Sequence, residues 1–152
     1  MKTLSNNLDK QEVLQRLRLV KPESARRWGK MTAGQMVCHL NDSFKAVIGE
    51  RSASSVNNIL GPNLIKWVAL YLPIHWPHGV PTRPENDQET GGTKPTEFAA
   101  DVRELEGLVD RLTRAEKDFA WGRHPLFGAM PDREWLRWGY LHMDHHLRQF
   151  GV

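Results

Sequence analysis

Apolar residues recur at helical spacing along most of the chain, beginning near the N-terminus. The first amphipathic stretch predicts a helix over about residues 9–19. Asp9 is its expected N-cap, Glu12 completes a capping box, and Leu8 is placed to form a hydrophobic staple. Pro22 follows, so the helix is expected to end before it.

The second stretch repeats this pattern and predicts a helix over about residues 32–49. Thr32 is the expected N-cap and Gln35 the third residue of a capping box. The apolar positions that follow share one face: Met36, Val37, Leu40, Phe44, Val47 and Ile48.

A shorter apolar stretch predicts a helix over about residues 63–72, lying across the core. The next segment, 73–95, is expected to be a long loop because it lacks periodicity. Residues 71–95 hold five of the nine prolines and the pair Gly91-Gly92. Loops of this length in compact domains are usually functional or disordered.

The clearest amphipathic pattern predicts a helix over about residues 96–118, with Thr96 as its cap. A turn-rich connection, 122–131, leads to a last helix that begins at Pro131 and runs to about Phe150, with Gly151 as its C-cap. No segment shows a convincing strand pattern. The fold class is therefore all-α: a four-helix bundle with a long crossover loop and a short extra helix, in a single domain over 1–152.

Composition excludes several classes of protein. The net charge is +3, but the bases are interleaved with acids and form no long cluster, which argues against nucleic-acid binding. No apolar run approaches the ~20 residues of a membrane span, and the N-terminus lacks the pattern of a signal peptide, so a cytoplasmic protein is expected. The single cysteine, Cys38, excludes an internal disulfide and is interpreted as a small buried apolar residue.

Candidate chemistry lies in the last helix, which reads "LHMDHHLRQFG" over 141–151. On a helical wheel, His146 lies about 40° from His142, and both share an arc with Trp135, Trp138 and Gln149. Two histidines at positions i and i+4 can reach one metal ion. His145 lies at the edge of this arc.

A third ligand would have to come from a facing helix, and His39 in the second helix is the candidate. Asp42, Glu134 and Asp144 are candidates to accept a hydrogen bond from a ligand histidine, with Asp144 the weakest because it faces outward. The alternative is that the histidines are satisfied or exposed polar residues. His75 and His78 lie in the long loop, from which they could cover a site, and His124 is expected to make a turn contact.

The segments "MTAGQMVCHLNDS" and "LHMDHHLRQFG" together resemble the DinB-like superfamily of bacterial metal-binding four-helix bundles. The segments "PHGVPTRPENDQETGGTKPTEF" and "HPLFGAMPDREW" resemble a branch of that superfamily whose function is uncharacterised. The resemblance covers the chain from about Trp28 to its end. It implies a divalent metal, nickel or zinc, on His39, His142 and His146, and a possible homodimer. Many relatives read H-R-G-Q after the second histidine of the motif, whereas this chain reads His146-Leu147-Arg148-Gln149.

Characterised members of that superfamily include transferases and isomerases that use low-molecular-weight thiols. The resemblance therefore implies a small-molecule substrate or thiol and a metal-dependent thiol S-transferase or hydrolase-like activity. The alternative is a non-catalytic bundle that binds a metal or ligand in a stress response. Three imidazoles also suit copper or iron, so the ligand set alone does not identify the metal.

Overall fold

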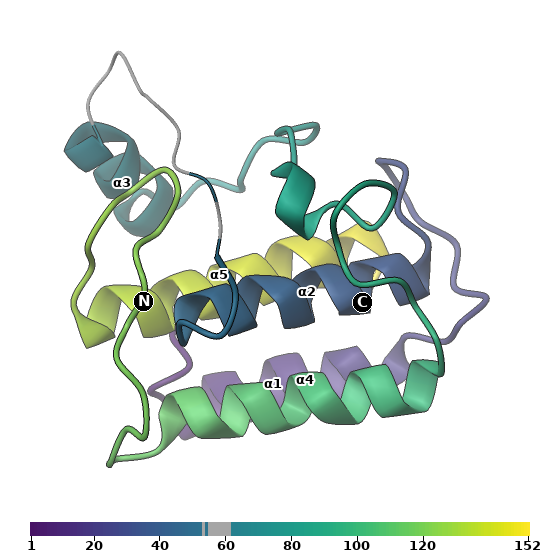
Figure 1. Ribbon diagram of the computed structural model, residues 1–152, viewed down its shortest axis with the longest axis horizontal. Coiled ribbons are helices and arrows are strands. Elements are labelled where there is room, and N and C mark those ends of the chain that lie inside the picture. Colours follow the sequence, from purple (N-terminus) through teal and green to yellow (C-terminus); the bar gives the residue numbers. More distant parts are fainter. Residues whose placement is uncertain (53, 55–61) are drawn as a thin grey trace.

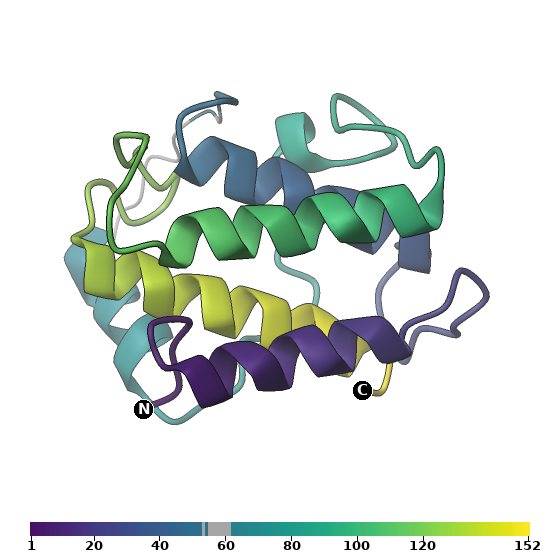
Figure 2. The ribbon, with the colours of Figure 1, turned by 90° about the horizontal axis from the view of Figure 1, so that it is seen from below.

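Four long helices form a bundle of two layers, seen from two directions in Figures 1 and 2. The computed structural model describes all residues except 53 and 55–61. One layer holds α2 (Ala33–Val47) and α5 (Asp132–Gln149), and the other holds α1 (Asn7–Leu19) and α4 (Phe98–Thr113). Helix α2 packs mainly against α4, and α1 packs against α5. The described part of the chain contains no β-strand, so the all-α prediction is confirmed.

The core lies between these layers and consists of the apolar faces that the periodicity predicts. Its largest fully buried side chains come from all four helices of the bundle and from α3: Leu17, Met36, Leu40, Phe44, Leu70, Leu105, Leu112, Met143 and Leu147. Each such side chain contributes roughly 1.5–3 kcal/mol when it leaves water. This burial holds α2 and α5 side by side, which brings their polar positions together as well.

The chain between α2 and α4 crosses the bundle on the side of α2 and α5 that faces away from α1 and α4 (Figure 1). It contains α3 (Pro62–Tyr71), close to the predicted range, and a single 3-10 turn, η1 (Pro84–Asn86). The crossover prediction is therefore confirmed, and the connection covers the α2–α5 layer.

The start of α1 differs from the prediction. Asn6, not Asp9, is the N-cap, and its side-chain oxygen accepts hydrogen bonds from the amides of Leu8 and Asp9. The Asp9 carboxylate instead accepts from the amide of Thr3, 2.9 Å away. Leu8 is 80% exposed, so the predicted hydrophobic staple does not form. Asn is as good an N-cap as Asp, and Asn6 starts the helix three residues earlier.

The other helix boundaries agree with the predictions to within a few residues. The capping box of α2 is present, with Thr32 and Gln35 each bonding the backbone of the other. Helix α4 is capped by Glu97 rather than Thr96 and ends at Thr113, five residues early. The polar segment after it turns back so that Asp118 pairs with Arg111 at 2.9 Å. Because this segment has no apolar face to bury, extending the helix through it would add no stabilising burial.

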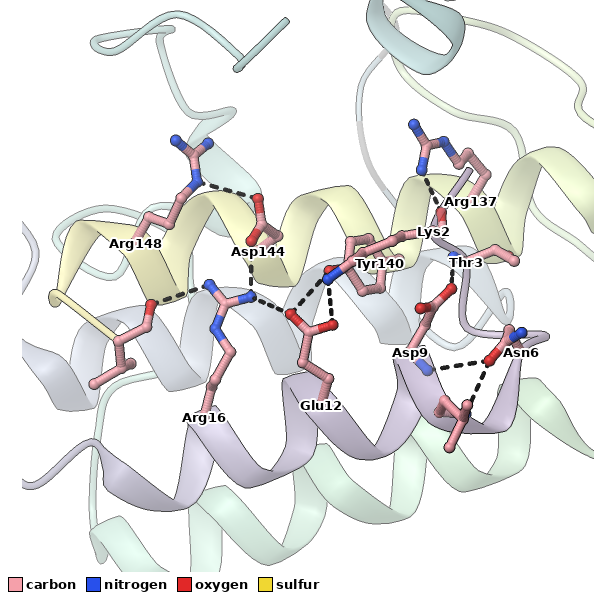
Figure 3. Close-up of polar contacts among 12 residues, drawn as sticks. Lys2, Thr3, Asn6, Asp9, Glu12, Arg16, Arg137, Tyr140, Asp144 and Arg148 are labelled. Atoms are coloured by element: carbon pink, nitrogen blue, oxygen red, sulfur yellow. Dashed lines mark hydrogen bonds and ion pairs between the residues drawn. The ribbon is translucent and has the colours of Figure 1, made fainter. Parts of the chain in front are cut away.

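The side of α5 that faces α1 carries a polar network (Figure 3). Asp144 accepts from Arg16 at 2.8 Å and from Arg148 at 3.1 Å. Glu12, expected to close a capping box, instead accepts from Tyr140 and Arg16. Charged groups thus occupy one face of α5, while its histidines face α2 and the crossover. None of the helices in the described ranges is long and apolar enough to span a membrane.

Candidate metal centre

Three imidazole rings meet between α2 and α5. One possible ligand atom from each of His39, His142 and His146 lies within 4.8 Å of the other two. All three side chains are buried, with exposed fractions of 6%, 9% and 8%. The Nε2 atoms of His39 and His142 are 3.1 Å apart. This is close to the ~3.3 Å that separates two nitrogens on one tetrahedral zinc ion.

The ring of His39 is oriented by the crossover connection. Its Nδ1 lies 2.9 Å from the carbonyl oxygen of Asn86, at the end of η1. Because a carbonyl can only accept, Nδ1 carries the proton and the lone pair of Nε2 faces the other two rings. A hydrogen bond from the outer ring nitrogen to a carbonyl is the usual arrangement around a metal-ligating histidine.

The ring of His146 is oriented from within its own helix. Its Nδ1 lies 3.0 Å from Oε1 of Gln149, and the amide nitrogen of Gln149 donates to the Trp28 carbonyl at 2.9 Å. Because the side-chain nitrogen of Gln149 donates to Trp28, Oε1 is the atom of this amide that faces His146. His146 therefore also has its proton on Nδ1 and directs its Nε2 lone pair inward.

His142 completes the set but has an unsatisfied group. Its buried Nδ1 has no hydrogen-bond partner in the described structure. Its ring packs against Trp138, with centroids 4.7 Å apart. Without an ion, its Nε2 can only donate to His39, and Nδ1 is then a buried acceptor with no donor, which is unfavourable. With Nε2 facing a cation instead, Nδ1 carries the proton, as it does in His39 and His146, and the three rings form a set of neutral ligands. The Nδ1–H of His142 still has no acceptor among the described residues.

The electrostatics of the cluster favour neutral imidazoles. Burial lowers the pKa of His39, although its bond to Asn86 acts in the opposite direction. Burial also lowers the pKa values of His142 and His146 well below the ordinary value, and the neighbouring histidines add to the effect. The lowered pKa values favour the neutral, singly protonated rings at neutral pH, and neutral imidazole is the form that binds metals.

The remaining histidines lie in different surroundings. His145 is half-buried beside His146, and burial lowers its pKa to about 4. His75 and His78 are both exposed, and His78 stacks on Trp28. His124 accepts hydrogen bonds from the backbone amides of Leu126 and Phe127, so the predicted turn contact is confirmed.

None of the three candidate carboxylates makes a hydrogen bond with the cluster. Asp42 is fully buried and accepts from the Thr93 amide at 2.8 Å and from Gln88 at 3.1 Å, so it anchors the loop beyond η1. Glu134 accepts from Tyr71 and lies 2.9 Å from Lys66. Asp144 lies on the α1 side, as described above.

Cys38 is buried, as predicted, with its sulfur 3.5 Å from Asp101. Burial and the nearby Asp101 carboxylate raise the pKa of its thiol to about 12. In the protein without metal, this raised pKa keeps the Cys38 thiol protonated at neutral pH.

Comparison with known families gives one match, to the family described as "Protein of unknown function (DUF1569)", over residues 3–151. The chain belongs to this family. Searches of curated proteins and of solved structures gave no match. Family membership covers nearly the whole chain but assigns no function, and the likeness to the DinB-like superfamily stays a resemblance.

Two groups that shape the centre of this DUF1569 member were not identified from the sequence. The Asn86 carbonyl is a backbone atom, which any residue supplies, so no residue pattern marks it. Trp28 lies outside the predicted helices, and its contact with Gln149 depends on tertiary packing. Gln149 itself carried a signal, because it shares the helical arc of His142 and His146.

Proposed function

We propose that this chain binds a divalent metal ion, zinc or nickel, through Nε2 of His39, His142 and His146, and that the ion activates a small thiol for transfer to an electrophile. The observation that carries the proposal is the convergence of three buried, neutral imidazoles, two of which direct their outer nitrogens to protein acceptors. Imidazole ligands suit both metals, and three protein ligands leave further positions for a substrate or water.

The neutral ligand set supports a thiol as the substrate. Three imidazoles do not offset the charge of a dication, and the outer nitrogens of His39 and His146 meet neutral acceptors rather than carboxylates. The bound ion would supply the positive charge that stabilises a thiolate at neutral pH. The surrounding rings of Trp76 and Trp138 are compatible with a partly apolar substrate.

The metal assignment is tested by measuring bound metal after the protein is loaded with Zn²⁺ or Ni²⁺ and dialysed. One equivalent is expected for the unaltered protein and almost none for His142→Ala. His75→Ala removes an exposed histidine and is the matched control, with full occupancy expected. Metal retained by a folded His142→Ala protein would contradict the site.

A non-catalytic metal-binding bundle is the second candidate, favoured by the closure of the centre, because all three rings are less than a tenth exposed. Only the transferase is expected to convert a thiol and an electrophile into product. The zinc- or nickel-loaded protein is mixed with bacillithiol and 1-chloro-2,4-dinitrobenzene, and formation of the thioether is followed by absorbance. A rate above that of His142→Ala supports the transferase, and an equal rate supports the non-catalytic protein.

A further inference from the structure

Two segments of the chain cover the histidine-bearing face of α5. The first is a strap, residues 26–30, and the second is a cover segment, residues 74–80. They meet where the indole of Trp28 stacks on the ring of His78, with centroids 4.0 Å apart and planes inclined by 12°. Within the cover segment, the ring of Trp76 lies 6.0 Å from that of His142 and 6.1 Å from that of His145. The cover segment therefore lies against the α5 side of the cluster.

The strap is tied firmly to the end of α5. The amide of Arg27 donates to the Gln149 carbonyl at 2.7 Å, and the Arg27 guanidinium donates to the Gly151 carbonyl at 3.1 Å. Gly29 has a positive φ of 74°, and a Cβ there would lie 2.6 Å from the amide nitrogen of Gln149. The backbone therefore passes directly over the Gln149 side chain, in a path that suits glycine.

The cover segment is held much more loosely. Most residues of both segments are exposed, so the difference lies in their hydrogen bonds. The hydrogen bond found for the cover segment in the described structure is a donation from the Trp76 indole to the Ala69 carbonyl at 2.9 Å. Its other contacts are ring packing, of His78 on Trp28 and of Trp76 beside His142 and His145. Segments with exposed backbone and few contacts open at low free-energy cost. The cover segment thus has fewer hydrogen bonds to break on opening than the strap has.

Gln149 connects the centre to this covering. Its side chain is 4% exposed and has both ends engaged, Oε1 with the His146 ring and the amide nitrogen with the Trp28 carbonyl. One amide therefore orients a candidate ligand ring and also holds the residue on which the cover segment stacks.

We propose that Gln149 is a positioning residue that couples metal binding at His146 to closure of the cover segment through Trp28. This inference rests on the proposed metal site. A cation on Nε2 polarises the Nδ1–H of His146 and fixes its ring, which strengthens the bond to Gln149 and keeps the amide directed at Trp28. Coupling of this kind is reciprocal, so a closed cover also slows release of the metal.

The decisive variant is Gln149→Glu, which separates the two hydrogen bonds. A glutamate carboxylate still accepts from His146, but it has no hydrogen to donate to the Trp28 carbonyl. Zinc binding is therefore expected to persist in Gln149→Glu, while its effect on Trp28 is lost. The full chain is labelled with 5-fluorotryptophan, and each fluorine resonance is assigned by single Trp→Phe substitutions.

In the unaltered protein, zinc is expected to shift the resonances of both Trp138, which packs on His142, and Trp28. In Gln149→Glu, Trp138 should still respond and Trp28 should not. A Trp28 shift of unaltered size in Gln149→Glu would overturn the coupling. Failure of zinc to move Trp138 in the unaltered protein, together with no bound metal, would instead overturn the metal site.

Zinc release to a chromogenic chelator gives a second test. Release is expected to be about tenfold faster in Gln149→Glu, the factor that corresponds to one lost hydrogen bond. It is also expected to be faster in Trp28→Ala, which keeps the backbone carbonyl but removes the indole on which His78 stacks. Because both substitutions break the same connection, the double variant should be no faster than either single one. His75→Ala, within the cover segment but exposed, should release zinc at the unaltered rate. Additive effects of the two substitutions would contradict a shared path.

Discussion

At the scale of single residues, the partners of the ring nitrogens distinguish one histidine from another. His39 and His146 donate from Nδ1 to an oxygen and leave Nε2 facing the cluster. His124 has the opposite polarity, because its Nδ1 accepts from two backbone amides and must be unprotonated. Burial lowers the pKa of all three, yet only the first two are arranged as ligands.

His124 makes the stability of the protein depend on pH. Burial lowers its pKa to about 3, whereas an unfolded chain has a pKa of about 6.5. The unfolded state therefore binds the extra proton, and this contribution to stability, complete above about pH 6.5, is lost as the pH falls toward 3. The loss approaches about 1.4 kcal/mol per pH unit.

The substitution His124→Asn removes the titration and keeps an acceptor for the two amides. Urea unfolding of the metal-free protein at pH 7 and pH 5 is expected to show a smaller loss of stability for His124→Asn than for the unaltered chain. Equal losses in the two proteins would show that His124 is protonated in the native state.

At the scale of elements, the centre depends on how the crossover connection is held to α2. Asp42 lies one turn after His39 and anchors the loop through Thr93 and Gln88. Arg51 adds bonds to the carbonyls of Glu85 and Gly91. These contacts keep the Asn86 carbonyl against His39, although Asp42 makes no hydrogen bond to a histidine.

Asp42→Asn is accordingly expected to weaken zinc binding by about tenfold, the lower end of the effect of lost outer contacts around a metal ligand. Isothermal titration calorimetry measures the change, and circular dichroism confirms the helical content. Asp144→Asn is the matched control, since it removes a carboxylate from α5 on the side that faces α1 (Figure 3). Equal losses of zinc affinity in both variants would indicate that the removed charge, and not the position of the loop, causes the change.

At the scale of the whole molecule, the metal would join α2 to α5 within one layer of the bundle. Its proposed ligands come from α2 and α5, and those ligands are held by the crossover loop and by the strap. None of these parts is assembled in an unfolded chain, so a bound ion stabilises only the native state.

Zinc is therefore expected to raise the melting temperature of the unaltered protein and not that of His142→Ala. At a free zinc concentration a hundred times the Kd, the stabilisation is about 2.7 kcal/mol. Differential scanning calorimetry with zinc and then with excess EDTA measures the shift and its reversal. A shift of equal size in His142→Ala would mean that zinc binds elsewhere.

The periodic apolar pattern predicted the helices of the bundle, because burial of one face is a local property of each segment. The positions of caps were less predictable. Asn6 and Asp9 are both good N-caps, and packing of the N-terminal residues against α5 decides between them: the Leu4 amide donates to the Leu136 carbonyl at 3.1 Å. The end of α4 was missed because the turn at Asp118 depends on its pairing with Arg111.

The sequence by itself determined the all-helical bundle and the inward arc of His142 and His146, because both follow from the fixed angle between residues on a helix. It also identified His39 as a candidate, through its place on a second helix. Only the tertiary structure decided that the three rings converge, that Asn86 and Gln149 orient His39 and His146, and that Trp28 and His78 stack beside His145. Those contacts join segments far apart in the chain, and their geometry exists only after the apolar faces have packed.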